Sequence, residues 1–542
     1  MSRADAFVDA DRASGGGLRR DTAVVTICIL LSRITGLGRV LATAAVLGSG
    51  LLGDVYQSAN LVPNLLFELA AGGVLQAVLV PTFVAAQRRG GTAALGDAVG
   101  ATAGVIMAGL GIVAVVGMAA SPLIANVLVA SEPVDGVASD KLSVMVPMVL
   151  VFIPQLVCYG LAMVVGAALA ARGRFVAAAL APAVNNIIVI AACIAYRQAR
   201  GQRLTTLQLT RWEFVLIAGG TTLGVIAFSA IPAIVLSVQG VRWRPRLVRN
   251  HPAVRALRQS FGWATLSVMG TLVPMGAALV LGNGAPGGVA VFVYAWAFFV
   301  LPHALIAVPV ATTLAPRVAH RWQDGDGQGV GSVVGAAMSI LVPLLFLAGA
   351  GIVALAWPVA RVAAFGQTAS QGIAPIAHTL AAFGPGLVGY GVAFVMMRLL
   401  FALDDVRLSA LVAVVGAVLG VVMMTVLSFV LADGDRAAAL AIGYGTSQIV
   451  VAALLTARLR RLTGAMGARF TGRLVAESVA GAAAAAAAML WLQARFAPTR
   501  RSGAVAILVA GVVGVVIFAG VLATLRRGKL LGAAELGRSG AT

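Results

Sequence analysis

Two arginines, Arg33 and Arg39, lie inside the first long apolar run of the chain, Thr22–Gly48. A charge in the hydrocarbon region costs about 2.5–3.5 kcal/mol on insertion scales, so such residues mark functional sites by default. The guanidinium group can bind phosphate through two parallel hydrogen bonds. The pair therefore predicts a polar cavity that binds a phosphate-bearing ligand. In the alternative, both side chains extend to the lipid headgroups or pair with Glu68.

The spacing of the two arginines bears on whether they can act together. They are six positions apart, so a straight helix would separate their directions by about 120°. Gly36 and Gly38 lie between them and could bend the helix, which would bring the two guanidinium groups closer.

The next apolar run carries three polar residues, Asn60, Asn64 and Glu68, at four-residue spacing. This spacing places them on one face of a helix. Pro63 and the pair Gly72–Gly73 predict a kinked or broken helix, of the kind that lines transporter cavities. We interpret Asn64 as a cavity residue, and Glu68 as the partner of an arginine or a proton-linked group.

Further polar residues lie within or at the ends of later apolar runs. His303 could change charge near neutral pH, although a structural histidine is the favoured interpretation. Arg398 precedes Asp404 and Asp405, and the three predict a solvated ion pair or, less favoured, a cation site. The pair Asn185–Asn186 predicts hydrogen bonds between helices.

Sequence motifs for catalysis or metal binding are missing. The chain has no HExxH, GxSxG or P-loop motif, and its cysteines (Cys28, Cys158 and Cys193) lie in apolar runs without a CxxC pattern. These observations predict neither an enzyme nor a cofactor or metal site.

The elements that position these residues follow from composition. Of 542 residues, 60% are hydrophobic and only 11% are charged, whereas soluble domains average about 25% charged residues. This excludes a water-soluble globular protein. The formal charge of +20 comes from arginines in short loops, a pattern that predicts membrane topology and contact with anionic lipids, not nucleic-acid binding.

The sequence thus predicts an all-α polytopic membrane protein with about 14 transmembrane helices, because each crossing needs about 20 apolar residues. The predicted spans are Thr22–Gly48, Gln57–Ala86, Val99–Ala119, Leu142–Ala171, Phe175–Tyr196, Phe214–Val238, Arg258–Gly282, Val289–Pro316, Val330–Ala356, Ile376–Leu403, Leu408–Leu431, Ala437–Arg458, Leu474–Leu492 and Ala504–Leu525.

Basic residues in the loops predict the orientation. With the N-terminus in the cytoplasm, 26 of the 39 basic residues fall inside, ten fall outside and three lie within spans. This bias predicts a plasma-membrane protein with both termini in the cytoplasm. The loop from Arg197 to Arg211 is the clear violation, since its arginines fall outside.

The residues from Ser32 to Pro81 carry a family resemblance. They read SRITGLGR, followed by LGSGLLGDVYQSANLVPNLLFELAAGGVLQAVLVP, and resemble the MurJ/MviN family of lipid II flippases in the MOP exporter superfamily. Similar motifs follow in the same order at Ala171–Asn186, Val293–Val318 and Arg398–Arg407. Four family positions differ. Val40 stands where better-known members carry an acidic residue, and Phe67, Glu68 and Ala297 stand where they carry arginines; the pattern resembles an actinobacterial branch.

The resemblance implies a fold. Two pseudo-symmetric six-helix lobes would surround a V-shaped central cavity, and two C-terminal helices would form a groove for a lipid tail. The implied parts are a cytoplasmic tail at 1–21, the N-terminal lobe at 22–238, a cytoplasmic linker at 239–257, the C-terminal lobe at 258–460, the two additional helices at 461–525 and a cytoplasmic tail at 526–542.

The resemblance also implies a function. The substrate would be lipid II, an undecaprenyl-pyrophosphate glycopeptide, moved from the inner to the outer leaflet by alternating access. Arg33, Arg39, Asn64 and Glu68 would line the substrate site, and Asp54 would form a gate contact. Asp405, Arg398 and His303 are candidates for ion coupling. Membrane lipids and proteins of cell-wall synthesis and division are the implied partners.

Other functions compete with this interpretation. An exporter of drugs or of another lipid-linked oligosaccharide, from the same superfamily, is the main alternative; the Ser32–Pro81 match and the two extra spans disfavour it. A membrane glycosyltransferase would need a carboxylate or histidine site in a large outer loop, and no loop is large. A scaffold would not need buried arginines.

Overall fold

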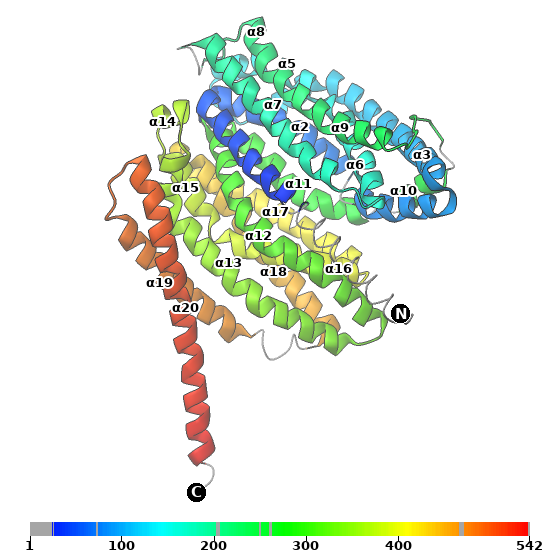
Figure 1. Ribbon diagram of the computed structural model, residues 1–542. Helices are drawn as coiled ribbons and strands as arrows, with labels where there is room; N and C mark the ends of the chain where they lie inside the picture. Colours follow the sequence, from blue (N-terminus) through cyan, green and yellow to red (C-terminus); the bar gives the residue numbers. More distant parts are fainter. Residues whose placement is uncertain are drawn as a thin grey trace, which may run out of the picture. The chain divides into compact units, whose positions relative to one another are not determined.

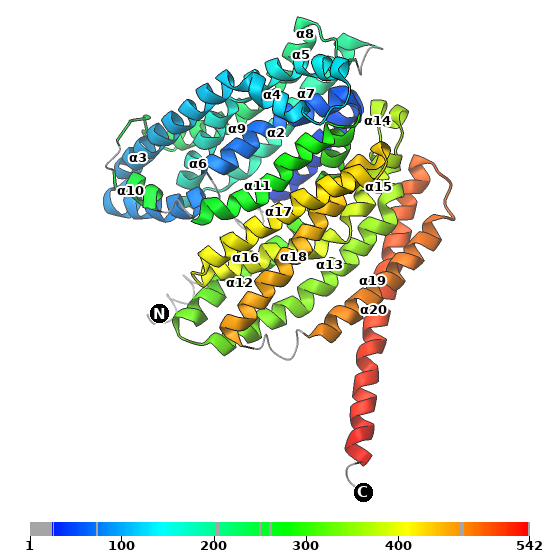
Figure 2. The ribbon, with the colours of Figure 1, turned by 180° about the vertical axis from the view of Figure 1, so that it is seen from behind.

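The computed structural model describes residues 24, 27–71, 74–201, 206–248, 251–259, 263–464 and 471–539. Within these ranges the regular structure is entirely helical (Figures 1 and 2). The predicted all-α class is therefore confirmed. After an N-terminal helix, Ile27–Leu47, the helices are α2 (Leu51–Ala71), α3 (Val74–Ala119), α4 (Ser121–Val129), α5 (Asp135–Phe152), α6 (Gln155–Ala171), α7 (Val176–Arg200), α8 (Arg211–Phe214), η1 (Val215–Gly219), α9 (Gly220–Val238), α10 (Pro252–Gln259), α11 (Trp263–Gly282), α12 (Gly288–Gln323), α13 (Gly327–Ala363), α14 (Gly366–Gln371), α15 (Ala374–Phe383), α16 (Gly386–Ala402), α17 (Val406–Val430), η2 (Asp433–Asp435), α18 (Arg436–Thr463), α19 (Gly472–Gln493) and α20 (Arg500–Ser539).

Breaks in the helices occur at glycine and proline, which disrupt regular helical geometry. Helix α3 changes direction at Gly90 and Gly91, whose backbone angles are not helical. Helices α15 and α16 are bent by 46° across their junction, where Pro385 precedes α16. The predicted break at Gly72–Gly73 lies outside the described residues, between the end of α2 and the start of α3.

Eleven helices in the described part of the chain are long and apolar enough to cross a membrane, or up to twelve if α15 and α16 form one bent span. Each of the fourteen predicted spans overlaps a helix. The two numbers differ because α3 covers parts of two predicted spans and because only Val268–Gly282 of α11 enters the count. The protein is thus polytopic, and the count of fourteen stays a prediction.

The helices form two compact units. The N-terminal unit comprises Met1–Val46, Ala59–Asn126 and Asp140–Thr265. Its apolar core lies among α3, α6 and α9, where fully buried leucine, valine and phenylalanine side chains meet; examples are Phe83, Val165 and Leu236. Helix α7 packs against α9, and α10 packs against α3.

The C-terminal unit comprises Leu47–Ser58, Val127–Ser139 and Leu266–Thr542. Helix α18 packs against α16 and α17, and α13 contacts α12 and α15. Helices α19 and α20 run side by side and pack on α13 (Figures 1 and 2). Two segments from the first third of the sequence therefore belong to the unit formed by its second half.

Candidate functional site

The N-terminal helix carries both predicted arginines. Arg33 is exposed and Arg39 is half-buried, and the helix is continuous through Gly36 and Gly38. These glycines lie against α7, where Asn186 and Ile190 are the nearest side chains. The glycines therefore allow close packing on α7 and do not bend the helix, which leaves the two arginines on different sides.

Asn186 holds this packing in place. Its side-chain amide donates to the Thr35 hydroxyl at 3.2 Å and to the Ser32 carbonyl at 3.4 Å. Asn186 is buried, so these bonds satisfy a polar group inside an apolar interface. They agree with the predicted role of Asn186 in bonding between helices, whereas Oδ1 of its neighbour Asn185 is buried without a hydrogen-bond partner among the described residues.

Arg39 lies beside polar groups from three other helices. Its guanidinium acts electrostatically on the hydroxyl of Tyr159 in α6 and on the thiol of Cys193 in α7. The Tyr159 side chain forms a hydrogen bond with that of Asn64 in α2. Two predicted site residues, Arg39 and Asn64, thus meet at a tyrosine that the sequence analysis did not single out.

Tyr159 belongs to a polar and aromatic cluster on α6. Its ring lies 5.7 Å from that of Phe67 and 6.3 Å from that of Phe228, centre to centre. One turn earlier, the buried Gln155 bonds to the Thr222 hydroxyl at 2.9 Å. We call Arg39, Asn64, Gln155 and Tyr159 the Arg39 cluster. It combines a half-buried cation, hydroxyl and amide groups with aromatic faces.

Glu68 lies apart from this cluster. Its side chain is exposed, and within the described ranges no ion pair joins it to Arg33 or Arg39. Asn64, one turn before it, donates to the Asn60 carbonyl at 3.0 Å. The interpretation of Glu68 as the partner of an arginine is therefore wrong for this conformation, and its place in a substrate site stays a prediction.

Asp54 is fully buried at the start of helix α12. Its carboxylate accepts hydrogen bonds from three backbone N–H groups, those of Gly287 at 2.6 Å, Val289 at 3.0 Å and Ala290 at 2.8 Å. The first N–H groups of a helix lack intrahelical partners and carry partial positive charge, so a carboxylate there is stabilised. Asp54 thereby joins α2 to α12 within the C-terminal unit.

Neighbouring contacts hold the same segment. The Tyr294 hydroxyl donates to the Gly48 carbonyl at 3.0 Å. The Asn283 amide donates to the Ser58 hydroxyl at 2.9 Å, and the Ser49 N–H donates to the side chain of Gln371 at 2.5 Å. The predicted gate residue therefore lies among contacts that link the segment Leu47–Ser58 to α11, α12 and α14.

His303 is buried in the C-terminal unit among aromatic rings. Its ring centre lies 4.4 Å from that of Tyr390 and 4.9 Å from that of Phe394. Trp296 continues this group through edge contacts with Tyr390 and with Tyr444 at 5.0 Å. We call these five residues the aromatic cluster. It supports the structural interpretation of His303.

The acidic residues after α16 have a different partner from the one expected. Asp405 forms an ion pair with Arg458 of α18, with 2.7 Å between Oδ2 and Nε. Arg398 is exposed, and its guanidinium lies 5.4 Å from the ring centre of Phe394. The predicted pairing of Arg398 with Asp404 or Asp405 is wrong, because α18 brings another arginine to the carboxylate.

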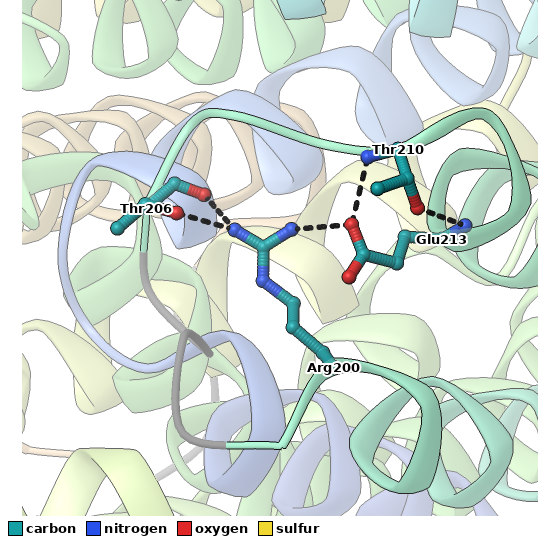
Figure 3. A network of polar contacts seen from close by, with 4 residues as sticks. All are labelled: Arg200, Thr206, Thr210 and Glu213. Carbon is teal, nitrogen blue, oxygen red and sulfur yellow. Dashed lines mark hydrogen bonds and ion pairs between the residues drawn. The ribbon is translucent and has the colours of Figure 1, made fainter.

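A buried ion pair that the sequence analysis missed lies between α7 and α8 (Figure 3). Arg200 Nη1 lies 3.1 Å from Glu213 Oε2, and both side chains are almost fully buried. Glu213 also accepts from the N–H of Thr210, and Arg200 donates to the Thr206 hydroxyl at 2.7 Å. This loop violated the positive-inside pattern, and Glu213 neutralises one of its arginines.

Metal binding finds no support among the described residues. They contain no group of three or more histidine, cysteine or acidic side chains that could hold an ion. All three cysteines are free thiols, with Cys28 and Cys193 buried and Cys158 half-buried. The Arg39 cluster offers a cation and hydrogen-bond donors of the kind that bind anions.

Comparisons with known proteins agree with these features. The family model described as "Lipid II flippase MurJ" matches residues 43–514. A protein of Rhizobium tropici described as a probable lipid II flippase MurJ is 25% identical over 515 residues, 93% of each chain. The lipid II flippase MurJ of Burkholderia cenocepacia is 25% identical over 424 residues, covering 77% of this chain and 79% of the relative.

Solved structures show the same fold. A lipid II flippase MurJ in an inward closed conformation superposes with a TM-score of 0.72 at 16% identity, covering 94% of this chain and all of that one. An inward-facing multidrug resistance MATE family transporter of the MOP superfamily gives a TM-score of 0.60 at 15% identity, covering 80% of this chain and 98% of that one. With the family model matching most of its length, the chain belongs to the lipid II flippase MurJ family.

Proposed function

We propose that the protein is a lipid II flippase, which moves the undecaprenyl-pyrophosphate glycopeptide from the inner to the outer leaflet by alternating access. The family membership and the relatives described as lipid II flippases support this function. The protein is a transporter and not an enzyme. Its many apolar helices and its family make it a multi-pass inner-membrane protein.

The observation that carries the proposal is the Arg39 cluster. A half-buried guanidinium beside Tyr159 and Asn64 offers hydrogen-bond donors at a fixed place within a membrane domain. Pyrophosphate carries its charge on oxygens that suit such donors. Arg33, exposed on the same helix, would extend the site, while Asn64 and Glu68 would contribute polar contacts.

The conformational part of the proposal assigns roles to two lobes, whose bounds differ from those of the compact units because Leu47–Ser58 and Val127–Ser139 belong to the C-terminal unit. The lobes 22–238 and 258–460, joined by the linker 239–257, would rock about a central cavity. Asp54 would act as a gate contact, because it bonds a segment of the N-terminal sequence half to α12. Asp405, Arg398 and His303 stay candidates for ion coupling, although the ion pair with Arg458 gives Asp405 a structural role and the aromatic packing gives His303 one.

The finer architecture is also proposed. Fourteen membrane-spanning helices with both termini in the cytoplasm would place the two helices of 461–525 beside the C-terminal lobe. Apolar side chains exposed along α20, such as Leu508, Val512 and Val516, suit contact with lipid, including the undecaprenyl tail. Membrane lipids and proteins of cell-wall synthesis and division are the proposed partners.

The test is rescue of a bacterium depleted of its own lipid II flippase. The parent protein should restore growth, and Arg39→Ala and Arg33→Ala should not, at equal expression and membrane insertion. Arg197→Ala is the matched control, because Arg197 is an exposed arginine of the same unit outside the cluster. It should rescue like the parent.

Two outcomes would change the proposal. Failure of the parent, when it is well inserted, would remove lipid II as substrate and favour export of another lipid-linked oligosaccharide or a drug. Rescue by both arginine variants would keep the function but move the pyrophosphate site away from the Arg39 cluster.

A further inference from the structure

An extended segment, Val241–Val248, follows α9 and lies along α3. Its residues alternate in burial at the start, since Val241 is buried and Trp243 half-buried, whereas Arg242 and Arg244 are exposed. In extended backbone, alternate side chains point to opposite sides and residues two apart are about 7 Å apart. We call this segment the arginine strap.

The strap is held by a row of glycines on α3. Gly96, Gly100 and Gly104 face the strap, and a Cβ atom on any of them would collide with a strap carbonyl. The carbonyls concerned are those of Arg242, Arg244 and Arg246. The N–H of Arg246 also donates to the Gly100 carbonyl at 3.0 Å. The strap backbone is thus fixed against the helix.

Side chains on the inner side complete this attachment. The ring of Trp243 packs on the core between α3, α6 and α9, and its Nε1 donates to the Ser237 hydroxyl at 3.2 Å. The inner residues hold the strap, so the side chains of Arg242 and Arg244 are not needed for that purpose. Arg242 and Arg244 project from a fixed support, unlike arginines of an ordinary loop.

Of the three arginines on the outer side of the strap, one forms an ion pair within the described residues and two do not. Arg246 pairs with Asp97 at 3.2 Å, and His251 lies 3.6 Å from the same carboxylate. Over the ranges that the structure describes, Arg242 and Arg244 take part in no ion pair. Two exposed cations on one side of a fixed strap therefore remain available for an external anion.

Apolar side chains beside these cations indicate which anion. Leu247 is 70% exposed and Val248 is 41% exposed, directly after the arginines. Exposed aliphatic residues next to basic ones are typical of segments that lie in the membrane interface, where apolar groups enter the acyl boundary and cations meet the headgroups. An acidic protein partner would not require this arrangement.

We propose that the arginine strap binds anionic phospholipid headgroups of the leaflet next to it. Arg242 and Arg244 contact the headgroup phosphates, and Leu247 and Val248 insert between the lipids. The strap would anchor the N-terminal unit by way of α3 and α9. The inference rests on the placement of the chain in a membrane and is independent of the transported substrate.

The test places a polarity-sensitive fluorophore on Leu247→Cys in a full-length protein that also carries Cys28→Ala, Cys158→Ala and Cys193→Ala. The protein is reconstituted in vesicles of phosphatidylcholine, with or without phosphatidylglycerol. Quenching by lipids labelled in the acyl chain should be stronger with phosphatidylglycerol. Arg242→Gln with Arg244→Gln should weaken this response roughly ten- to thirty-fold, because each arginine near an anionic membrane surface contributes about 1 kcal/mol of attraction to the headgroups.

The matched control is Arg197→Gln with Arg211→Gln. It removes the same charge from the same unit, at the other end of α9, and should keep the parent response. Equal quenching in the two kinds of vesicle would overturn the proposal, as would an equal loss in the control. Protection of the fluorophore by an added acidic peptide, without any response to phosphatidylglycerol, would assign the strap to a protein partner instead.

Discussion

The two units differ in what their interior polar residues do. In the N-terminal unit, Arg39 lies beside Tyr159 and Asn64, and it forms no ion pair within the residues that the structure describes. In the C-terminal unit, Trp296 and His303 are enclosed by other rings at 4.4 to 5.7 Å. One interior contains a half-buried cation, and the other uses its polar rings for packing.

This difference argues against two equivalent binding halves. A phosphate-bearing substrate needs fixed positive charge, which the Arg39 cluster provides and the aromatic cluster lacks. At the family position where better-known members carry an arginine, this chain has Ala297, one residue after Trp296. We infer that the N-terminal unit supplies most of the recognition of pyrophosphate, while the C-terminal unit supplies a well-packed frame.

Removing the free cation should weaken substrate binding more than any other substitution considered. Arg39→Ala should weaken binding of a pyrophosphate-bearing lipid roughly ten- to a hundred-fold, since a hydrogen bond to a charged group contributes about 1.5–3 kcal/mol. Native mass spectrometry of the purified protein measures the binding. Trp296→Phe, the matched change in the other unit, should bind like the parent. An equal loss of binding there would show that the C-terminal unit contributes as much to substrate recognition as the N-terminal unit.

Arg200→Met tests whether every buried arginine of the N-terminal unit serves the substrate. It leaves Glu213 buried without its cation, which should destabilise the unit by about 3–5 kcal/mol. Thermal unfolding in detergent measures the loss, and exposed Arg197→Met is the control. Unchanged stability together with lost binding would place Arg200 in the substrate site and contradict the structural role assigned to it.

Asp54→Asn tests the buried charge of the C-terminal unit. The amide would set an NH2 group against the backbone N–H groups at the start of α12, at a cost of about 1–3 kcal/mol. The melting temperature in detergent should fall, whereas exposed Asp433→Asn should leave it unchanged. No difference between these variants would mean that the carboxylate does not stabilise the α2–α12 contact.

His303→Phe should have the smallest effect. A phenyl ring keeps the packing against Tyr390 and Phe394, so the change in unfolding free energy should stay below about 1.5 kcal/mol. Rescue of flippase-depleted cells should persist. Loss of rescue at normal stability would give His303 a role in ion coupling. The polar groups of the C-terminal unit would then serve transport as well as packing.

The sequence predicted the long helices, one hydrogen bond between helices and the family. Apolar runs gave the positions of the long helices, because a membrane span needs a long continuous apolar segment, whereas the short helices α4 and α14 lie outside every predicted span. The expectation that Asn186 bonds between helices agrees with the structure, since an amide in an apolar run has few other ways to satisfy its donors. The Ser32–Pro81 motif led to the family.

Contacts between residues far apart in the chain could not be predicted from apolar runs and local spacing. Asp405 meets Arg458, 53 residues away, because α17 and α18 pack together; the nearby Arg398 was the only candidate that spacing suggested. Tyr159, the partner of Asn64, lies in an apolar stretch that gives no signal. The arginines of the strap looked like ordinary loop charges, because the α3 glycines that fix them lie about 140 residues earlier.

The bonds of Asp54 also have a consequence for biogenesis. Its backbone partners follow it by 233 to 236 residues, and ribosomes add about 5–20 residues per second. For roughly ten to fifty seconds of synthesis, the nascent chain therefore presents this carboxylate to the insertion machinery before α12 exists. During that interval, water or an insertion factor has to solvate Asp54, and the C-terminal unit can close only when translation has passed Ala290.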